Sequence, residues 1–125
     1  RLWSWARDRF ETPERFFSRF FVVNYCPLAF LEEGGKNRTP DKLPQAERRQ
    51  LIEACDEALA ETVALLKPTH VVGVGVYARD AAKRVLSAAG VRIGVMLHPS
   101  PASPKANRGW APQAEDDLTR CGIVL

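Results

Sequence analysis

The sequence predicts an α/β fold, a three-layer α/β/α sandwich with a central parallel sheet that helices cover on both faces. Short apolar segments at residues 20–23, 70–75 and 92–97 have the composition of buried strands. They alternate with segments of helical periodicity, which implies strand–helix–strand crossovers and a parallel sheet. The balance of 46% hydrophobic and 26% charged residues is typical of a globular chain, and no repeat or linker divides it into domains.

The first part of the chain predicts two short helices and a strand. Leu2–Phe10 has the pattern of a short helix. Thr12 is placed to cap a second helical turn, because its hydroxyl can accept a backbone N–H and Pro13 suits the first helical position. Phe20–Val23 is apolar and rich in β-forming residues, so we expect a buried strand that ends before Asn24.

The middle of the chain predicts a loop, a long helix and a strand. Glu32–Pro44 carries two adjacent glycines and two prolines, which favours a loop. In Gln45–Leu66 apolar residues recur at spacings of three and four, which predicts an amphipathic helix that Pro68 stops. His70–Gly75 is the next expected strand.

The last part predicts two more helices around a third strand. Tyr77–Ala89 is helical in pattern, with Gly90 as its C-terminal cap. Arg92–Leu97 is the third strand, and a proline-rich loop follows it. A last helix is expected over about Ala111–Cys121, and Ile123–Leu125 is a candidate edge strand.

Two polar side chains follow predicted strands. Asn24 comes directly after the first strand and His98 after the third. Because ligands bind outside the carboxyl ends of strands in such sheets, we expect both residues at one rim of the sheet.

Composition narrows the function classes without naming one. The net charge of +3 is compatible with nucleic acid as a partner but does not require it. No apolar run is long enough to span a membrane, and we expect no membrane partner. The three cysteines are widely spaced, without a Cys-x-x-Cys or Cys/His cluster, so we expect reduced thiols in an intracellular protein and no zinc or iron–sulfur site. The chain opens on Arg1 instead of methionine, which suggests a fragment or a trimmed chain.

The segment Gly73–Ala78 fits the pattern G-x-G-x-x-A between a strand and a helix. It is compatible with a dinucleotide-binding turn. That turn also needs an acidic residue about twenty positions on, and residues 92–99 have none. The competing interpretation is a tight turn whose glycines allow close packing.

Asn24 has an amide carbonyl acceptor and an NH₂ donor side by side. This pair matches the N3–H donor and O4 acceptor of uracil, whereas cytosine presents the opposite pattern. The competing interpretation is an asparagine that caps a turn.

The segment from His98 to Trp110 is the strongest candidate for chemistry. Its prolines at 99, 101 and 104 stiffen it, and no acidic residue interrupts it. A neutral His98 can donate to an oxyanion on a leaving base, and the loop suits contact with phosphates and an extruded nucleotide. The competing interpretation is an exposed proline-rich loop.

Together, the segments VVNYCPLAF and HPSPASPKANRGW resemble the single-strand-selective monofunctional uracil-DNA glycosylases. The resemblance extends over GGKNRTPDKLP, the long helix and the strand HVVGVG. It implies a three-layer α/β/α fold and hydrolysis of the N-glycosidic bond of flipped-out deoxyuridine, and also of 5-hydroxymethyldeoxyuridine, in DNA base-excision repair. No metal or cofactor is needed.

The resemblance also implies roles for individual residues. Asn24 reads the uracil edge, and His98 stabilises the charge on uracil O2 as the base leaves. The stretch 34–48 and the loop after His98 contact DNA. The DNA-binding residues that we expect are Gly34, Gly35, Lys36, Asn37, Arg38, Thr39, Ser100, Pro101, Ala102, Ser103, Pro104, Lys105, Asn107, Arg108, Gly109 and Trp110.

Two departures limit the match. Relatives carry a basic residue and an asparagine where this chain has Ala102 and Ser103. The family's first motif, of the type G-M-N-P-G-P, positions the hydrolytic water and is absent here. We therefore expect residues 1–125 to be the C-terminal portion of a single glycosylase domain, inactive alone.

The expected partner is uracil-containing DNA, single- or double-stranded. We expect a monomer to bind it, in the cytoplasm (nucleoid) of a bacterium or in a eukaryotic nucleus. A non-catalytic DNA-binding module and a nucleotide-cofactor protein are the alternatives.

Overall fold

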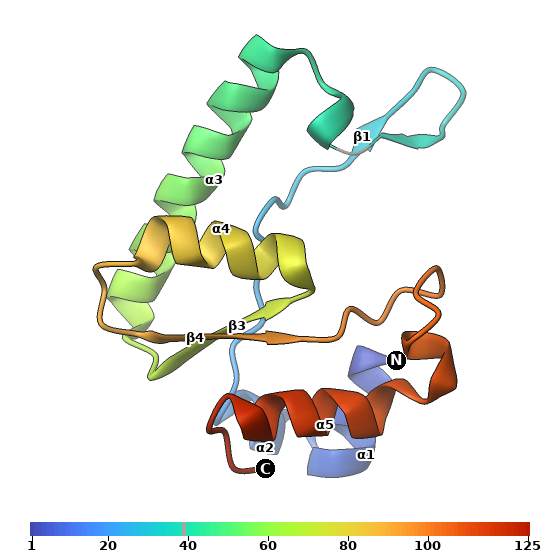
Figure 1. Ribbon diagram of the computed structural model, residues 1–125, viewed down its shortest axis with the longest axis vertical. Coiled ribbons are helices and arrows are strands. Elements are labelled where there is room, and N and C mark those ends of the chain that lie inside the picture. The colour runs from blue at the N-terminus through green and yellow to red at the C-terminus, as the bar shows by residue number, and fades with distance from the viewer. Residues whose placement is uncertain (39) are drawn as a thin grey trace. The chain divides into compact units, whose positions relative to one another are not determined.

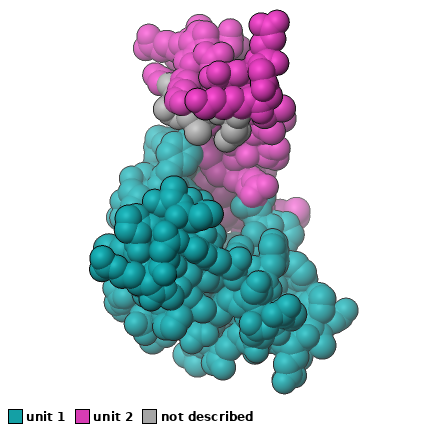
Figure 2. Space-filling model, turned by 90° about the vertical axis from the view of Figure 1, so that its right-hand side faces the viewer, with its two compact units in different colours: residues 1–23, 68–125 teal, residues 24–67 magenta. Residues whose placement is uncertain are grey.

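The chain forms two compact units. The computed structural model describes residues 1–38 and 40–125, with only the backbone described at residues 37 and 41. The first unit comprises residues 1–23 and 68–125, and the second unit comprises residues 24–67 (Figure 2). His98 belongs to the first unit and Asn24 to the second.

The first unit begins with two short helices, α1 (Leu2–Phe10) and α2 (Pro13–Phe17), as predicted. Thr12 is the N-cap of α2, and its Oγ1 accepts the N–H of Arg15 at 3.3 Å. The buried faces of the two helices are aromatic. Trp5 and Phe10 of α1 meet edge to face with ring centroids 5.8 Å apart, and both side chains are buried.

The sheet of the first unit consists of two parallel strands, β3 (His70–Val74) and β4 (Arg92–Met96). The crossover between them is α4 (Val76–Leu86), so the predicted strand–helix–strand unit is confirmed. The helix ends three residues earlier than predicted. A turn follows it, and Gly90, with φ of +68°, comes after that turn instead of capping the helix itself.

Helices cover both faces of this sheet (Figure 1). Gly73 faces α4, whereas Gly94, which pairs with Val72 on the opposite face, lies against Cys121 at the end of α5 (Trp110–Arg120). The α/β class is thus confirmed, with α1, α2 and α5 sharing one core beside β4. The buried residues of that core are Trp5, Ala6, Phe10, Phe16, Met96, Ala106, Trp110, Ala114 and Leu118.

Two predicted strands are wrong. Phe20–Val23 lies outside any strand, and its Phe21 and Val23 side chains are 65% and 52% exposed. A strand needs a neighbour for its backbone groups, and among the described residues only β1–β2 and β3–β4 pair. Ile123–Leu125 is not a strand either, because the N–H of Ile123 bonds back to the carbonyl of Leu118 at the end of α5.

The second unit is built on α3 (Gln45–Leu66), whose bounds are those predicted. The stretch predicted as a loop contains more structure than expected. β1 (Phe30–Leu31) and β2 (Asn37–Arg38) form a small antiparallel hairpin, and a 3-10 helix, η1 (Pro40–Lys42), follows it. Gly35, with φ of +79°, allows the tight turn between the strands.

Candidate active site

His98 lies two residues past the last paired residue of β4. Val74 pairs with Met96 at the end of the ladder, and the N–H of Gly75 donates to the carbonyl oxygen of Met96 at 2.9 Å. The pairing therefore extends to the residue after β3. His98 stands at the carboxyl rim of the sheet, where α/β proteins bind ligands, as the sequence predicted.

Two glycines shape this rim. A Cβ atom on Gly73 would lie 2.2 Å from the backbone nitrogen of Arg79, so α4 packs directly on β3. Gly75 has φ of +92°, and a Cβ there would lie 3.2 Å from the Cβ and 3.3 Å from the Cδ2 of His98. These contacts favour the packing interpretation of the glycine motif and make Gly75 a direct neighbour of the histidine.

The exposed imidazole of His98 has a defined tautomer. Its Nδ1 accepts the backbone N–H of Ser100 at 3.1 Å. Since a backbone N–H can only donate, a neutral ring carries its proton on Nε2. The Nε2–H group is a hydrogen-bond donor at the rim, which is what stabilisation of a developing oxyanion requires.

The loop after the histidine is braced by its own hydrogen bonds. Ser100 and Ser103 accept backbone N–H groups of the loop on their Oγ atoms, at 3.2 and 3.3 Å. The Nδ2 of Asn107 donates to the carbonyl of Pro101 at 2.9 Å. A 3-10 helix, η2 (Ala106–Arg108), closes the loop. The stiffness expected from the prolines is therefore reinforced by these internal bonds.

The loop offers part of its predicted DNA-binding set to solvent. Lys105 and Arg108 are exposed, and they give the loop positive charge. Ser100 and Ser103 are half-buried. The other exposed members of the set are Pro101, Ala102, Pro104, Asn107 and Gly109.

Two members of that set serve the fold. Trp110 is 4% exposed, and its Nε1 donates to the carbonyl of Leu97 at 2.7 Å, so the structure does not offer the ring to DNA. Asn107 uses both amide atoms within the protein, because its Oδ1 also accepts from the Nη2 of Arg1 at 2.7 Å. Arg1 further donates to the carbonyl of Ser100 at 3.3 Å, which ties the start of α1 to the loop.

Asn24 opens the second unit, where it is exposed and lies outside any helix or strand. The hydroxyl of Tyr25 next to it donates to Asp56 on α3, which fastens this segment within the unit. Burial raises the pKa of the Cys55 thiol to about 11, and the neighbouring Cys26 thiol adds to the shift. All three cysteines are free. The role of Asn24 in reading a base stays a prediction, as does its place on one rim with the histidine.

The predicted DNA-contacting stretch of the second unit lies on and beside the small hairpin. Gly34, Gly35 and Lys36 are exposed between β1 and β2. The Nη2 of Arg38 donates to the carbonyl of Lys42 at 2.6 Å, so part of its guanidinium holds the hairpin to η1. The remaining two predictions, Thr39 and the side chain of residue 37, lie outside the described residues.

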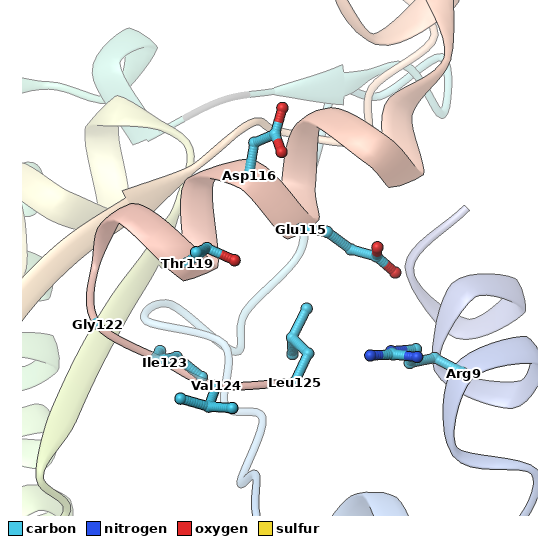
Figure 3. Close-up of a pocket in the computed structure, with 8 residues that line it drawn as sticks. All are labelled: Arg9, Glu115, Asp116, Thr119, Gly122, Ile123, Val124 and Leu125. Carbon is cyan, nitrogen blue, oxygen red and sulfur yellow. The ribbon is translucent and has the colours of Figure 1, made fainter.

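Among the described residues, no group of three or more His, Cys, Asp or Glu side chains could hold a metal ion. No described helix is long and apolar enough to cross a membrane. A cavity of about 390 Å³ lies beside α5 (Figure 3). It includes no predicted site residue, and its lining is Arg9, Glu115, Asp116, Thr119, Gly122, Ile123, Val124 and Leu125.

Comparison with known proteins decides the family. A model of the uracil DNA glycosylase superfamily matches residues 1–119. The chain belongs to this superfamily. It is 43% identical to the single-strand selective monofunctional uracil DNA glycosylase of Bos taurus, over 99% of this chain and 46% of the relative's length. The proteins of the same description from Rattus norvegicus and Mus musculus are 43% and 42% identical, each over 99% of this chain and 45% of the relative. The chain thus spans about half the length of these relatives.

Within this glycosylase fold, the sequence analysis missed Arg1 and Asp117 and singled out a third neighbour of the histidine, Gly75, only as part of the glycine motif. Gly75 lies beside the His98 ring, and Arg1 donates to the carbonyl of Ser100 in the loop. The Oδ2 of Asp117 accepts the N–H of Leu97 at 2.9 Å. Of the two missed residues, only Asp117 left a usable signal. It follows Trp110 by seven residues, or two turns of α5, so the two share a helix face.

Proposed function

We propose that this protein is a uracil-DNA glycosylase that hydrolyses the N-glycosidic bond of flipped-out deoxyuridine, and of 5-hydroxymethyldeoxyuridine, without a lyase step. One observation carries the proposal: in a chain of this superfamily, His98 presents a proton-bearing Nε2 at the carboxyl rim of the sheet. The partner is uracil-containing DNA, single- or double-stranded, in the nucleoid or nucleus. The protein acts as a monomer.

The histidine supports departure of the base. As the bond between C1′ and uracil N1 breaks, its electron pair passes to the base and negative charge develops on uracil O2. The Nε2–H of His98 donates to that oxygen, and the ring stays in place because the Ser100 N–H holds Nδ1. Water then bonds to C1′, and the proton that it releases returns to the base.

Base selection and DNA binding depend on other parts of the chain. Asn24 recognises uracil through its paired donor and acceptor, and cytosine leaves both groups without partners. Exposed Lys105 and Arg108 contact phosphates beside the extruded nucleotide. The hairpin around Lys36 adds a further contact with the DNA backbone.

Replacement of the histidine tests the proposal. In the full-length protein we expect His98→Ala to lower kcat for uracil release roughly a hundredfold or more, because an oxyanion donor contributes on the order of 3–4 kcal/mol. The affinity for uracil-containing oligonucleotide should change little. His70→Gln is the matched control, since it replaces the other histidine of the chain, at the amino end of β3.

Two results would contradict the proposal. Excision by His98→Ala at near wild-type rate would remove the histidine from the chemistry. If the full-length wild-type protein binds the oligonucleotide without releasing uracil, it is instead a DNA-binding module.

A further inference from the structure

Two side chains of α5 hold the residue that precedes the histidine. The Oδ2 of Asp117 accepts the N–H of Leu97 at 2.9 Å, and the Nε1 of Trp110 donates to the Leu97 carbonyl at 2.7 Å. Both contacts are partly buried. One acceptor and one donor from a helix thus engage both polar backbone groups of a single residue.

These side chains take the place of a neighbouring strand. In a strand, the N–H and C=O of one residue point to the same side, and successive residues alternate. The carbonyl of Met96 points to β3, where it meets the N–H of Gly75, so Leu97 points to the other edge of β4. On that edge the described residues provide no strand for β4, and α5 supplies the hydrogen-bond partners instead.

The carboxylate of Asp117 is directed mainly at this backbone contact. Its side chain is 21% exposed, and its Oδ1 lies 3.1 Å from the Nη2 of Arg120, whose side chain is 74% exposed. An exposed ion pair of this kind contributes little. A carboxylate that accepts a partly buried backbone N–H is more valuable, because the N–H without a partner is costly.

We propose that Asp117, together with Trp110, is a positioning residue that sets the direction in which β4 delivers His98 to the reaction. The inference rests on the proposed role of that histidine. The ring lies between two backbone anchors, with Leu97 held by α5 on one side and the Ser100 N–H on Nδ1 on the other. If Leu97 is released, the start of the loop can move relative to Gly75, which packs against the ring.

Four variants separate this role from general stability. Asp117→Ala removes the acceptor, whereas Asp117→Asn keeps an oxygen that can accept the N–H. Trp110→Phe keeps an aromatic ring in the core and removes only the donor. Asp116→Ala is the matched control, an exposed carboxylate one position away on the same helix.

The first readouts are spectroscopic and use the full-length protein. In Asp117→Ala we expect the Leu97 amide to exchange its hydrogen at least about tenfold faster, because it loses its partner. We also expect the ¹⁵N signals of the His98 ring to show a lower share of the Nε2–H tautomer. Asp117→Asn should restore most of both, and Asp116→Ala should change neither.

The second readout is uracil release by the full-length protein. We expect Asp117→Ala to lower kcat about ten- to hundredfold with little change in KM, since a misplaced catalytic group costs rate more than binding. Trp110→Phe should lower kcat in the same direction. It also carries the test if Asp117→Ala does not fold.

The outcomes distinguish this inference from the proposed function. Unchanged His98 signals in Asp117→Ala, or in Trp110→Phe if that variant alone folds, would overturn the positioning role, whatever the enzyme does. An Asp117→Asn variant as impaired as Asp117→Ala would also overturn it. If His98→Ala keeps full activity while the spectroscopic changes appear, the proposed function fails and the α5 contacts still position the ring.

Discussion

Gly75 limits the space that the His98 ring can occupy. Its φ of +92° is rare for a residue with a side chain, and a Cβ would lie 3.2 Å from the histidine Cβ. We predict that Gly75→Ala destabilises the protein by about 1–3 kcal/mol through strained backbone and displaces the ring. Urea denaturation measures the first effect, and the ring signals of His98 measure the second.

A second glycine provides the control for this prediction. Gly90 also has a positive φ, of +68°, but a Cβ there would meet nothing within 4 Å. Gly90→Ala should therefore lower the free energy of unfolding through backbone strain and leave the ring signals of His98 unchanged. Equal His98 signals in both variants would mean that Gly75 does not constrain the ring.

The proposed role of Asn24 in base selection depends on the donor and the acceptor of its amide. A carboxylate in place of its amide loses the NH₂ donor that meets uracil O4 and can accept from the cytosine N4–H₂ group instead. We predict that Asn24→Asp relaxes discrimination toward cytosine in the full-length protein. The measurement is the ratio of kcat/KM for uracil and cytosine in otherwise identical oligonucleotides. A ratio equal to that of the wild type would remove Asn24 from base selection.

At the scale of elements, the loop that ends in η2 separates residues that hold its shape from residues that face solvent. Lys105 and Arg108 are exposed, whereas Asn107 is committed to Pro101 and Arg1. We predict that Lys105→Ala and Arg108→Ala each weaken DNA binding for all sequences alike. Each should lower the slope of log affinity against log salt by about 0.7–0.9, the value for one lost phosphate contact.

The salt titration has a control within the same chain. Lys83 is exposed on α4, outside the loop. Lys83→Ala removes one positive charge without touching the loop, so its salt slope should match that of the wild type. If all three variants lower the slope equally, the loop has no special contact with phosphates.

The elements also show which parts of the fold local sequence can reveal. The bounds of α3 follow from apolar spacing and from Pro68, and the start of α2 follows from the hydroxyl of Thr12. These features depend on neighbours in sequence. Phe20–Val23 has strand composition, but strand formation depends on a partner elsewhere, and composition contains no information on whether one is present.

The candidate site also has some features that the sequence reveals and others that depend on the folded structure. The place of His98 past a strand could be predicted, because strand order and the carboxyl rim follow from the alternation of elements. The tautomer of the ring could not, since it depends on the direction of one backbone N–H. The burial of Trp110 was missed because a tryptophan in a polar loop gives no local sign of the core that it enters.

At the scale of the whole molecule, the first unit leaves several large apolar side chains exposed. Phe21 is 65% exposed in Phe20–Val23, an extended segment outside any strand (Figure 1). Trp3 and Phe17 are 57% and 53% exposed, with their ring centroids 6.3 Å apart. Exposed aromatic side chains beside unpaired extended backbone favour association. The chain of 125 residues spans about half the length of its relatives.

We therefore predict that the chain of 125 residues, studied alone, associates in a concentration-dependent manner. Sedimentation velocity between micromolar and near-millimolar protein should show the larger species. Phe21→Lys should shift the midpoint of association to a higher protein concentration, because it places a charge in the extended segment. Leu65→Lys is the control, since Leu65 is 81% exposed but lies on α3 in the second unit. If Leu65→Lys acts as strongly as Phe21→Lys, general hydrophobicity drives association; if only Phe21→Lys acts, the extended segment is where a neighbouring chain pairs.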